Sequence, residues 1–270
     1  MTETPSANWL VRRPAHGPPR ARLFCFAHAG VGASAYRGWA AELPSYLEVC
    51  AVQLPGRESR LREPPFQHMA PLIDALLPVL EPLLDRPFAL FGHSMGALVA
   101  AEVSVALRAA GAPTPLHLFV SGHRAPHLPD PDPPLGGLDD AAFVAEINRR
   151  YGGIPAEILA ERELLELLLP GLRADIRVLE SRPAGGVLVF DCPLSIFGGT
   201  DDRRATPAQL AAWREGARAS ARVRMFPGGH FYLSERRTEL LADIAATLDA
   251  DLAAVVQSRT TPPPLAWSKG

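Results

Sequence analysis

The sequence predicts an α/β fold in which a mainly parallel sheet is flanked by helices. Short apolar segments typical of buried strands alternate along the chain with longer segments of helical periodicity. The chain has 270 residues, of which 47% are hydrophobic and 21% charged, so it can form one sizeable core. A third observation is a G-x-S-x-G sequence (residues 92–96) placed where an expected strand is followed by an expected helix.

The expected strands are short and almost continuously apolar, as strands buried on both faces are. They cover residues 23–27, 47–53, 88–91, 116–121, 193–197 and 223–226. The expected helices place apolar side chains on one helical face. They cover residues 36–43, 69–84, 96–110, 207–216 and 236–256. This order of strands and helices is that of a doubly wound sheet.

Residues 125–182 interrupt the alternation with a proline-rich connector followed by helical material, and this stretch is too long for a plain crossover. Asp139 is a suitable N-cap for a helix that places Phe143, Ile147 and Tyr151 on one face. We expect this helical insertion to be a lid over the carboxyl edge of the sheet. Phe143 and Ile147 are the candidates to line a substrate channel beneath it.

A second helical region of the insertion, residues 161–181, repeats leucines at the spacing of one helical face. Pro170 is expected to kink or divide it. We expect most of these leucines only to pack the insertion onto the body of the protein.

These patterns predict a single domain over residues 1–256 with the lid at about 125–182, followed by a disordered tail over residues 257–270. The sequence has neither a long apolar run typical of a membrane span nor a signal-peptide pattern, which favours a cytoplasmic protein. The formal net charge of -2 gives no general attraction to nucleic acid or to membranes. The three cysteines are expected to be buried free thiols, and no metal site is expected.

Ser94 is the candidate nucleophile, because it is the serine of the G-x-S-x-G sequence. In a nucleophile elbow the chain turns sharply from strand to helix, and the close backbone approaches on either side leave room only for glycine. The helix that follows would direct its N-terminal N–H groups toward developing negative charge. This context predicts an α/β-hydrolase fold with a serine nucleophile.

A serine hydroxyl needs a base, and among eight histidines His230 is the best placed. It follows two glycines in a tight loop between the last expected strand and the last long helix, as the chain order Ser, Asp, His requires. The third member should be a carboxylate after the strand at residues 193–197. Asp201 and Asp202 both qualify, and the spacing alone does not decide between them.

An oxyanion hole needs two backbone N–H donors, one from the residue after the nucleophile and one from the loop after an early strand. Met95 would supply the first donor. Ala29, in the glycine-containing turn after the strand at residues 23–27, is the candidate for the second.

Five short segments are together far more specific than the serine motif alone. They read FAHAG (26–30), QLPGRE (53–58), FGHSMG (91–96), SGHRAP (121–126) and PGGHF (227–231). In these segments the chain resembles the discrete type II thioesterases that serve polyketide synthases and nonribosomal peptide synthetases. The resemblance runs from about residue 23 to residue 252. It implies a G-x-x-D segment for the acidic member, and alignment on Gly199 then favours Asp202 over Asp201.

The resemblance implies that the substrates are acyl groups held as thioesters on the phosphopantetheine arms of acyl or peptidyl carrier proteins. No cofactor of the enzyme's own is expected. The alternatives are a chain-terminating or fatty-acyl carrier thioesterase, which would share the catalytic residues, and a catalytically silent carrier-binding module. The loop at residues 55–60 is either a contact for phosphate or an acidic carrier surface, or a solvated loop with local ion pairs.

Overall fold

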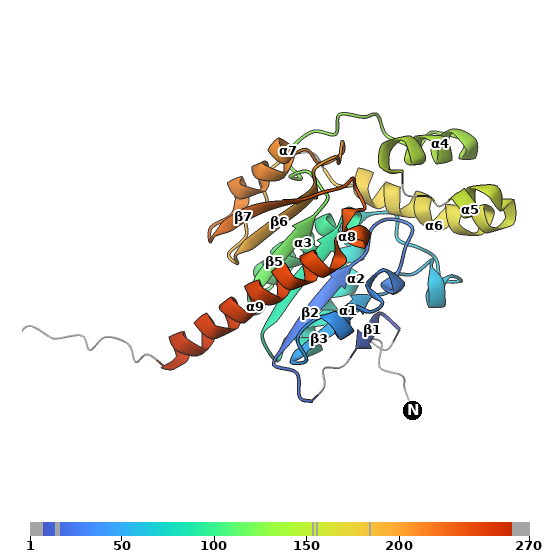
Figure 1. The fold of residues 1–270 in the computed structure, drawn as a ribbon. Coiled ribbons are helices and arrows are strands. Elements are labelled where there is room, and N and C mark those ends of the chain that lie inside the picture. Colours follow the sequence, from blue (N-terminus) through green and yellow to red (C-terminus); the bar gives the residue numbers. More distant parts are fainter. Residues whose placement is uncertain (1–7, 14–16, 153, 155, 184, 261–270) are drawn as a thin grey trace, which may run out of the picture.

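The computed structural model describes residues 8–13, 17–152, 154, 156–183 and 185–260. In this part of the chain seven strands form one sheet in the order β1-β3-β2-β4-β5-β6-β7 (Figure 1). The strands are β1 (Leu10–Arg13), β2 (Ala21–Phe26), β3 (Leu47–Val52), β4 (Phe88–His93), β5 (His117–Ser121), β6 (Leu194–Gly199) and β7 (Ala221–Phe226). Only β1 pairs antiparallel, so the predicted mainly parallel sheet is confirmed.

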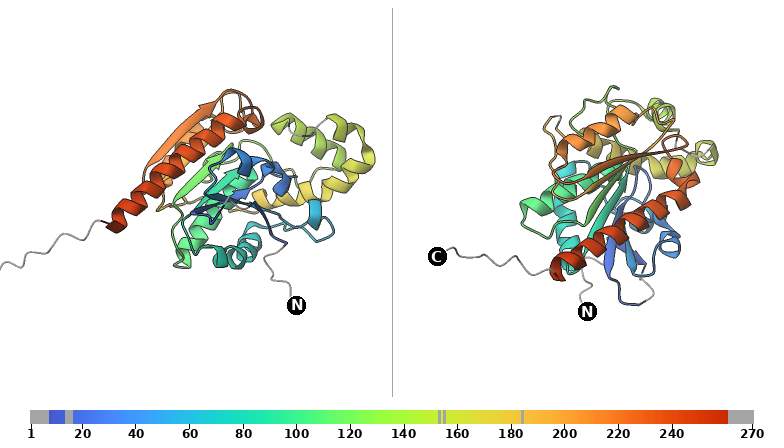
Figure 2. Two further views of the ribbon diagram at one scale, coloured as in Figure 1. Left: turned by 60° about the horizontal axis from the view of Figure 1, so that its bottom comes forward. Right: turned by 60° about the vertical axis from the view of Figure 1, so that its left-hand side comes forward.

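Helices cover both faces of the sheet, and each face has its own apolar core (Figures 1 and 2). On one face lie α2 (Met69–Leu80), α3 (Met95–Ala109) and α7 (Pro207–Ala211); on the other lie α1 (Trp39–Glu42), α8 (Tyr232–Glu235) and α9 (Arg237–Thr260). Short 3-10 turns are η1 (Ala33–Tyr36), η2 (Glu58–Arg60), η3 (Glu81–Leu83) and η4 (Ala212–Gly216). None of the helices in these described ranges is both long and apolar enough to span a membrane.

The main differences from the sequence prediction lie near the two ends of the chain. The short strand β1 was not predicted, because only Leu10 of its four residues is buried. Helix α9 continues to Thr260, so the prediction of a disordered tail beginning at residue 257 is wrong for its first four residues. The rest of that predicted tail, residues 261–270, lies outside the described residues. The three cysteines are buried and free, as predicted.

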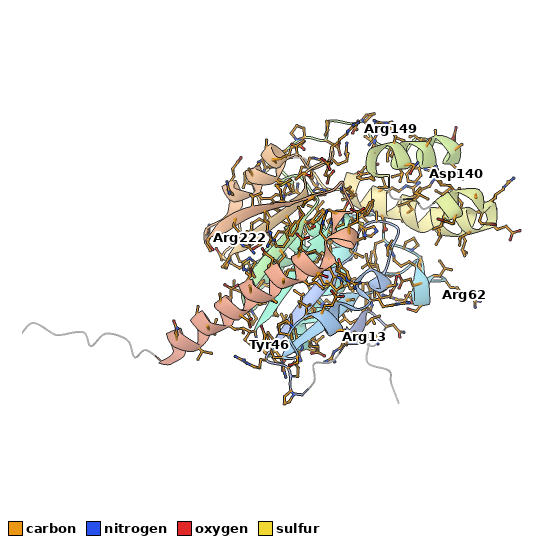
Figure 3. All side chains as sticks on the ribbon, in the orientation of Figure 1. Arg13, Tyr46, Arg62, Asp140, Arg149 and Arg222 are labelled. Carbon is orange, nitrogen blue, oxygen red and sulfur yellow. The ribbon has the colours of Figure 1, made fainter. Side chains whose placement is uncertain are left out.

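The helical insertion (residues 125–182) lies beyond the carboxyl ends of the parallel strands and contains α4 (Asp140–Tyr151), α5 (Ala156–Ala160) and α6 (Arg162–Glu180) (Figure 2). The predicted N-cap is confirmed, because the Asp139 side chain accepts a hydrogen bond from the Ala142 N–H at 2.9 Å. Exposed charged side chains such as Arg149 cover the outside of α4 (Figure 3). Of the two effects expected of Pro170, a kink or a division, the division is wrong, because helix α6 runs through Pro170 without a break, and its neighbours Leu169 and Gly171 are buried.

Candidate active site

Ser94 stands at the sharp turn between β4 and α3, with a backbone φ of 54° that L-residues rarely adopt. A Cβ on Gly92 would lie 1.9 Å from the Gly96 carbonyl oxygen, and a Cβ on Gly96 would lie 1.9 Å from the Phe26 carbonyl oxygen. Both positions therefore require glycine. The Ser94 N–H donates to the Ser121 carbonyl at 2.8 Å, which ties the turn to the neighbouring strand. The geometry is that of a nucleophile elbow.

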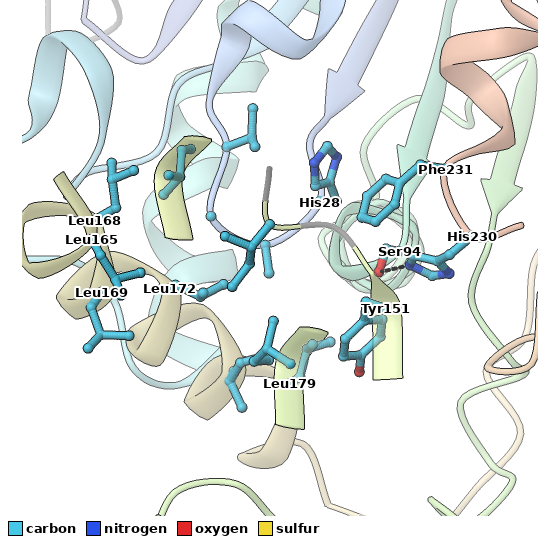
Figure 4. Close-up of a pocket in the computed structure, with 17 residues that line it drawn as sticks. His28, Ser94, Tyr151, Leu165, Leu168, Leu169, Leu172, Leu179, His230 and Phe231 are labelled. Carbon is cyan, nitrogen blue, oxygen red and sulfur yellow. Dashed lines mark hydrogen bonds between the residues drawn. The ribbon is translucent and has the colours of Figure 1, made fainter. Parts of the chain in front are cut away.

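The structure brings Ser94, His230 and Asp202 into one hydrogen-bonded chain (Figure 4). His230 Nδ1 lies 2.8 Å from Asp202 Oδ2, and His230 Nε2 lies 3.0 Å from Ser94 Oγ. Because the carboxylate can only accept, Nδ1 carries the proton and Nε2 is free to accept the serine proton. The three residues are only 8%, 7% and 5% exposed, respectively. Such an arrangement can activate a serine for attack on a carbonyl group.

Close packing between two loops brings Asp202 to the histidine. A Cβ on Gly199, at the end of β6, would lie 2.2 Å from the Gly229 carbonyl oxygen, so the loop after β6 contacts the loop that carries His230. The Asp202 side chain then points toward the imidazole, whereas Asp201 is exposed. The structure thus places Asp202, and not its neighbour, in hydrogen-bonding contact with His230.

Three further histidines surround this chain and are held neutral. Burial, and to a smaller extent the nearby His230, lower the pKa of His28 to about 4. Burial likewise lowers the pKa of His123 to about 4 and that of His93 well below its usual value. The ring centroid of His93 lies 5.1 Å from that of His230. Around neutral pH these neighbours therefore add no positive charge beside the candidate base.

The two residues predicted as oxyanion donors, Ala29 and Met95, lie on segments that adjoin Ser94. Met95 is the first residue of α3, where backbone N–H groups have no acceptor within the helix. Ala29 follows β2 and lines the same cavity as Ser94. The close approach of Gly96 to the Phe26 carbonyl brings the start of α3 against the end of β2. The two segments expected to supply the N–H donors therefore lie next to each other.

An apolar cavity of about 130 Å³ extends from Ser94 beneath α6 (Figure 4). Its lining includes Ile147 and the leucine-rich face of α6, which comprises Leu165, Leu168, Leu169, Leu172, Ile176 and Leu179. The expectation that most of these leucines only pack the insertion onto the body is therefore wrong. Phe143 does not belong to the described residues that line this cavity, because it is buried between α4 and α6 in the insertion's own core.

A second, more polar cavity of about 220 Å³ opens from Ser94 toward the proline-rich connector. Arg124 and Arg204 line it together with Asp130 and Asp132, and Arg204 forms ion pairs with both aspartates. Tyr151, which the sequence places on one helical face with Phe143 and Ile147, borders both cavities. Its ring centroid lies 5.2 Å from that of His230. Ser94 therefore lies where an apolar and a polar cavity meet.

The loop at residues 55–60 agrees in part with the second expectation, because Glu58 and Ser59 are exposed and Arg60 forms a local ion pair with Glu63. Arg57 is buried and pairs with Asp175 of α6, so it is neither a free phosphate ligand nor a solvated side chain. Arg60 is buried too, pairs with Glu63 and lies over the ring of Trp9 at 4.2 Å. Sequence analysis missed Asp175, although a lone carboxylate on the leucine face of a helix was a signal that could have found it.

Comparison with known proteins places this geometry in a family. A family model described as a thioesterase domain matches residues 21–248. Gramicidin S biosynthesis protein GrsT of Aneurinibacillus migulanus is 39% identical over 86% of this chain and 91% of its own length. RedJ, a thioesterase from the prodiginine biosynthetic pathway in Streptomyces coelicolor, is 42% identical with a TM-score of 0.79, and the match covers 87% of this chain and 95% of RedJ.

A second solved structure shows the subtype. BorB, a type II thioesterase from the borrelidin biosynthetic cluster, is 35% identical with a TM-score of 0.78, over 89% of this chain and 96% of BorB. The serine elbow and the hydrogen-bonded chain described above agree with these relationships. The chain therefore belongs to the thioesterase family and is a type II thioesterase with the α/β-hydrolase fold.

Proposed function

We propose that the protein hydrolyses acyl thioesters on the phosphopantetheine arms of carrier proteins, and so removes aberrant acyl groups from a polyketide or nonribosomal peptide synthase. The observation that carries the proposal is the chain of Ser94, His230 and Asp202 at the mouth of an apolar cavity. GrsT and BorB, which belong to gramicidin S and borrelidin biosynthesis, support the assignment to such a pathway.

In the first half of the reaction Ser94 Oγ attacks the thioester carbonyl while its proton passes to His230 Nε2. Asp202 keeps the imidazole in the required tautomer and stabilises its charged form. The N–H groups of Ala29 and Met95 bind the oxyanion of the tetrahedral intermediate. The C–S bond then breaks, the thiol of the arm leaves with the proton from His230, and the acyl group remains on Ser94.

In the second half His230 takes a proton from a water molecule as the water oxygen attacks the acyl ester. His230 then gives this proton to Ser94 Oγ as the ester C–O bond breaks, which releases a carboxylic acid and free Ser94. The apolar cavity beneath α6 suits a hydrocarbon acyl chain, and Ile147 lies on its wall. No cofactor beyond the arm of the carrier is required, because each step is a proton transfer or an acyl transfer to these residues.

The test uses carrier proteins whose arms are loaded with acyl groups of increasing length, with mass spectrometry to follow the loss of the acyl group. We expect release of short and non-native acyl groups, and no release by the Ser94→Ala variant. Preference for full-length products or for long fatty acyl groups would instead indicate a chain-terminating or a fatty-acyl carrier thioesterase. Binding of carriers without release would indicate a silent binding module.

A further inference from the structure

The loop that carries Ala29 (residues 28–34, hereafter the oxyanion loop) is held by side chains from two other segments. Its N–H groups donate to carboxylate and amide oxygens: Gly30 to Asp175 Oδ2 at 2.7 Å, Gly32 to Glu58 Oε1 at 3.0 Å, and Ala33 to Gln53 Oε1 at 2.9 Å. Two of these acceptors come from the QLPGRE segment at residues 53–58. The third comes from the insertion, which is more than a hundred residues away in sequence.

Asp175 is the link between the insertion and this loop. It is only 2% exposed, and Arg57, at 5%, donates to both of its oxygens at 2.6 and 2.7 Å. A bidentate pair fixes the plane of the carboxylate, so Oδ2 is held where it also accepts from Gly30. Burial of an ion pair is weak evidence for stability by itself. Within the described residues of α6, Asp175 is the one charged residue on an otherwise apolar buried face, and positioning the oxyanion loop explains its presence there better than a contribution to stability does.

Helix α6 also touches both loops directly. A Cβ on Gly171 would lie 2.8 Å from the Gly56 carbonyl oxygen, and a Cβ on Gly30 would lie 3.2 Å from Leu172 Cδ1. A displacement of α6 would therefore change the carboxylate position and the packing of the oxyanion loop together.

The QLPGRE segment shows backbone strain of the kind that accompanies function. In the described part of the chain, Glu58 and Ser94 are the two non-glycine residues with positive φ, at 47° and 54°. Such conformations persist where the surrounding structure holds them, and they cluster at functional sites. At Glu58 the strained backbone directs the carboxylate to the Gly32 N–H and to Ser34 Oγ, the latter at 2.5 Å.

We propose that Asp175 is a positioning residue which, together with Arg57, aligns the oxyanion loop. Because Asp175 lies on α6, this alignment depends on the position of the insertion relative to the sheet. The inference rests on the proposed role of Ala29 as an oxyanion donor. The Gly30 N–H belongs to the peptide group next to Ala29, so anchoring it restricts the rotation of Ala29. The insertion thus acts on the chemistry of the site as well as on the shape of its cavity.

The experiment compares two ways of removing the anchor. Asp175→Asn keeps the size of the side chain but disrupts the bidentate pair. The double variant Arg57→Met with Asp175→Leu replaces the buried pair with apolar groups, which commonly preserves stability, and it leaves the Gly30 N–H without an acceptor. The matched control is Glu48→Gln, which disrupts the buried pair of Glu48 with Arg22, 2.8 Å apart, at the amino ends of the strands.

Four quantities are measured in each variant: the thermal midpoint, kcat and KM for one acyl thioester, and the affinity for an alkyl trifluoromethyl ketone. This ketone adds to a serine hydroxyl as a tetrahedral alkoxide and so reports the oxyanion site. We expect both Asp175 variants to lose about 10- to 100-fold in kcat and similarly in ketone affinity, with KM changed less than about twofold. The Glu48→Gln control should keep the wild-type kcat whatever its midpoint.

Wild-type kcat and ketone affinity in the folded double variant would overturn the proposal and leave the thioesterase reaction intact. Equal losses in Asp175→Asn and in the Glu48→Gln control would also overturn it, because general destabilisation would then explain both. Failure of the wild-type protein to release any acyl group would contradict the proposed function instead.

Discussion

Replacing Asp202 with asparagine keeps the size of the side chain but changes which atom can face His230. The backbone N–H of Arg204 donates to Asp202 Oδ1 at 2.8 Å, so in the variant the side-chain amide oxygen of the asparagine must occupy the position of Oδ1. Its NH2 group then faces His230 Nδ1, which lies 2.8 Å from Oδ2 in the native protein. Because NH2 can only donate, Nδ1 must accept and the imidazole proton moves to Nε2. That nitrogen, 3.0 Å from Ser94 Oγ, can no longer take the serine proton.

The expected loss is large because the ring is held in the wrong tautomer. The corresponding change in a serine protease lowers kcat by about 10⁴-fold, which corresponds to about 5 kcal/mol in the barrier. The assay is initial-rate hydrolysis of an acyl thioester with detection of the free thiol, together with a thermal midpoint to verify folding. The matched control is Asp201→Asn, where the side chain is exposed, and we expect its rate to stay within about twofold of wild type.

Two results would refute this reasoning. The first is a loss of less than about tenfold in folded Asp202→Asn, far short of the effect of the wrong tautomer. The second is a larger loss in Asp201→Asn than in Asp202→Asn, which would make Asp201 the orienting acid.

Three further predictions concern the nucleophile, the cavity and pH. Ser94→Ala should keep the wild-type midpoint and release no thiol, and measurable turnover by the pure variant would exclude Ser94 as nucleophile. Leu172→Ala should change the kcat/KM ratio between short and long acyl thioesters by about 10- to 200-fold. Phe143→Ala should leave this ratio unchanged but lower the free energy of unfolding by about 3–5 kcal/mol. The same ratio in both variants would contradict the assignment of Leu172 to the cavity wall and of Phe143 to the core of the insertion. Because the folded-state pKa values of His28 and His123 are about 4, below the unfolded value of about 6.5, the unfolded chain binds more protons between these values. The stability that these histidines contribute is therefore complete above about pH 6.5 and is lost as pH falls toward 4, by up to about 1.4 kcal/mol per pH unit for each histidine. Urea unfolding at a series of pH values measures this slope, and His28→Gln should reduce it.

Sequence analysis predicted the parallel strands well because each is an apolar run that is buried on both faces. It missed β1, since three of the four side chains there are not buried and an edge strand needs no such run. It expected Pro170 to kink or divide α6, because local propensity disfavours proline inside a helix, but α6 continues through Pro170, where its neighbours Leu169 and Gly171 are buried. Local signals therefore fail where long-range contacts decide the structure.

The site shows the same limit. The spacing of residues left Asp201 and Asp202 equivalent, and only the contact between Gly199 and the histidine loop brings one of them to the imidazole. The leucine periodicity of α6 indicates that one face is covered, but it carries no information on whether protein or a cavity lies opposite. Asp175 likewise acquires its partners, Arg57 and Gly30, only when three distant segments meet.

Because an apolar and a polar cavity both open from Ser94, the orientation of a bound inhibitor can be controlled by its design. An electrophile that reacts with Ser94 can be extended in two ways, with hydrocarbon toward the α6 leucines and hydrogen-bonding groups toward Arg204 and its aspartate partners. The isomer with the two arms exchanged has the same atoms, but its polar arm would lie against leucines. Each buried polar group left without a partner costs about 1–3 kcal/mol. Such a pair of isomers would therefore differ in affinity by about 5- to 150-fold for every misplaced group, although composition and reactive centre are identical.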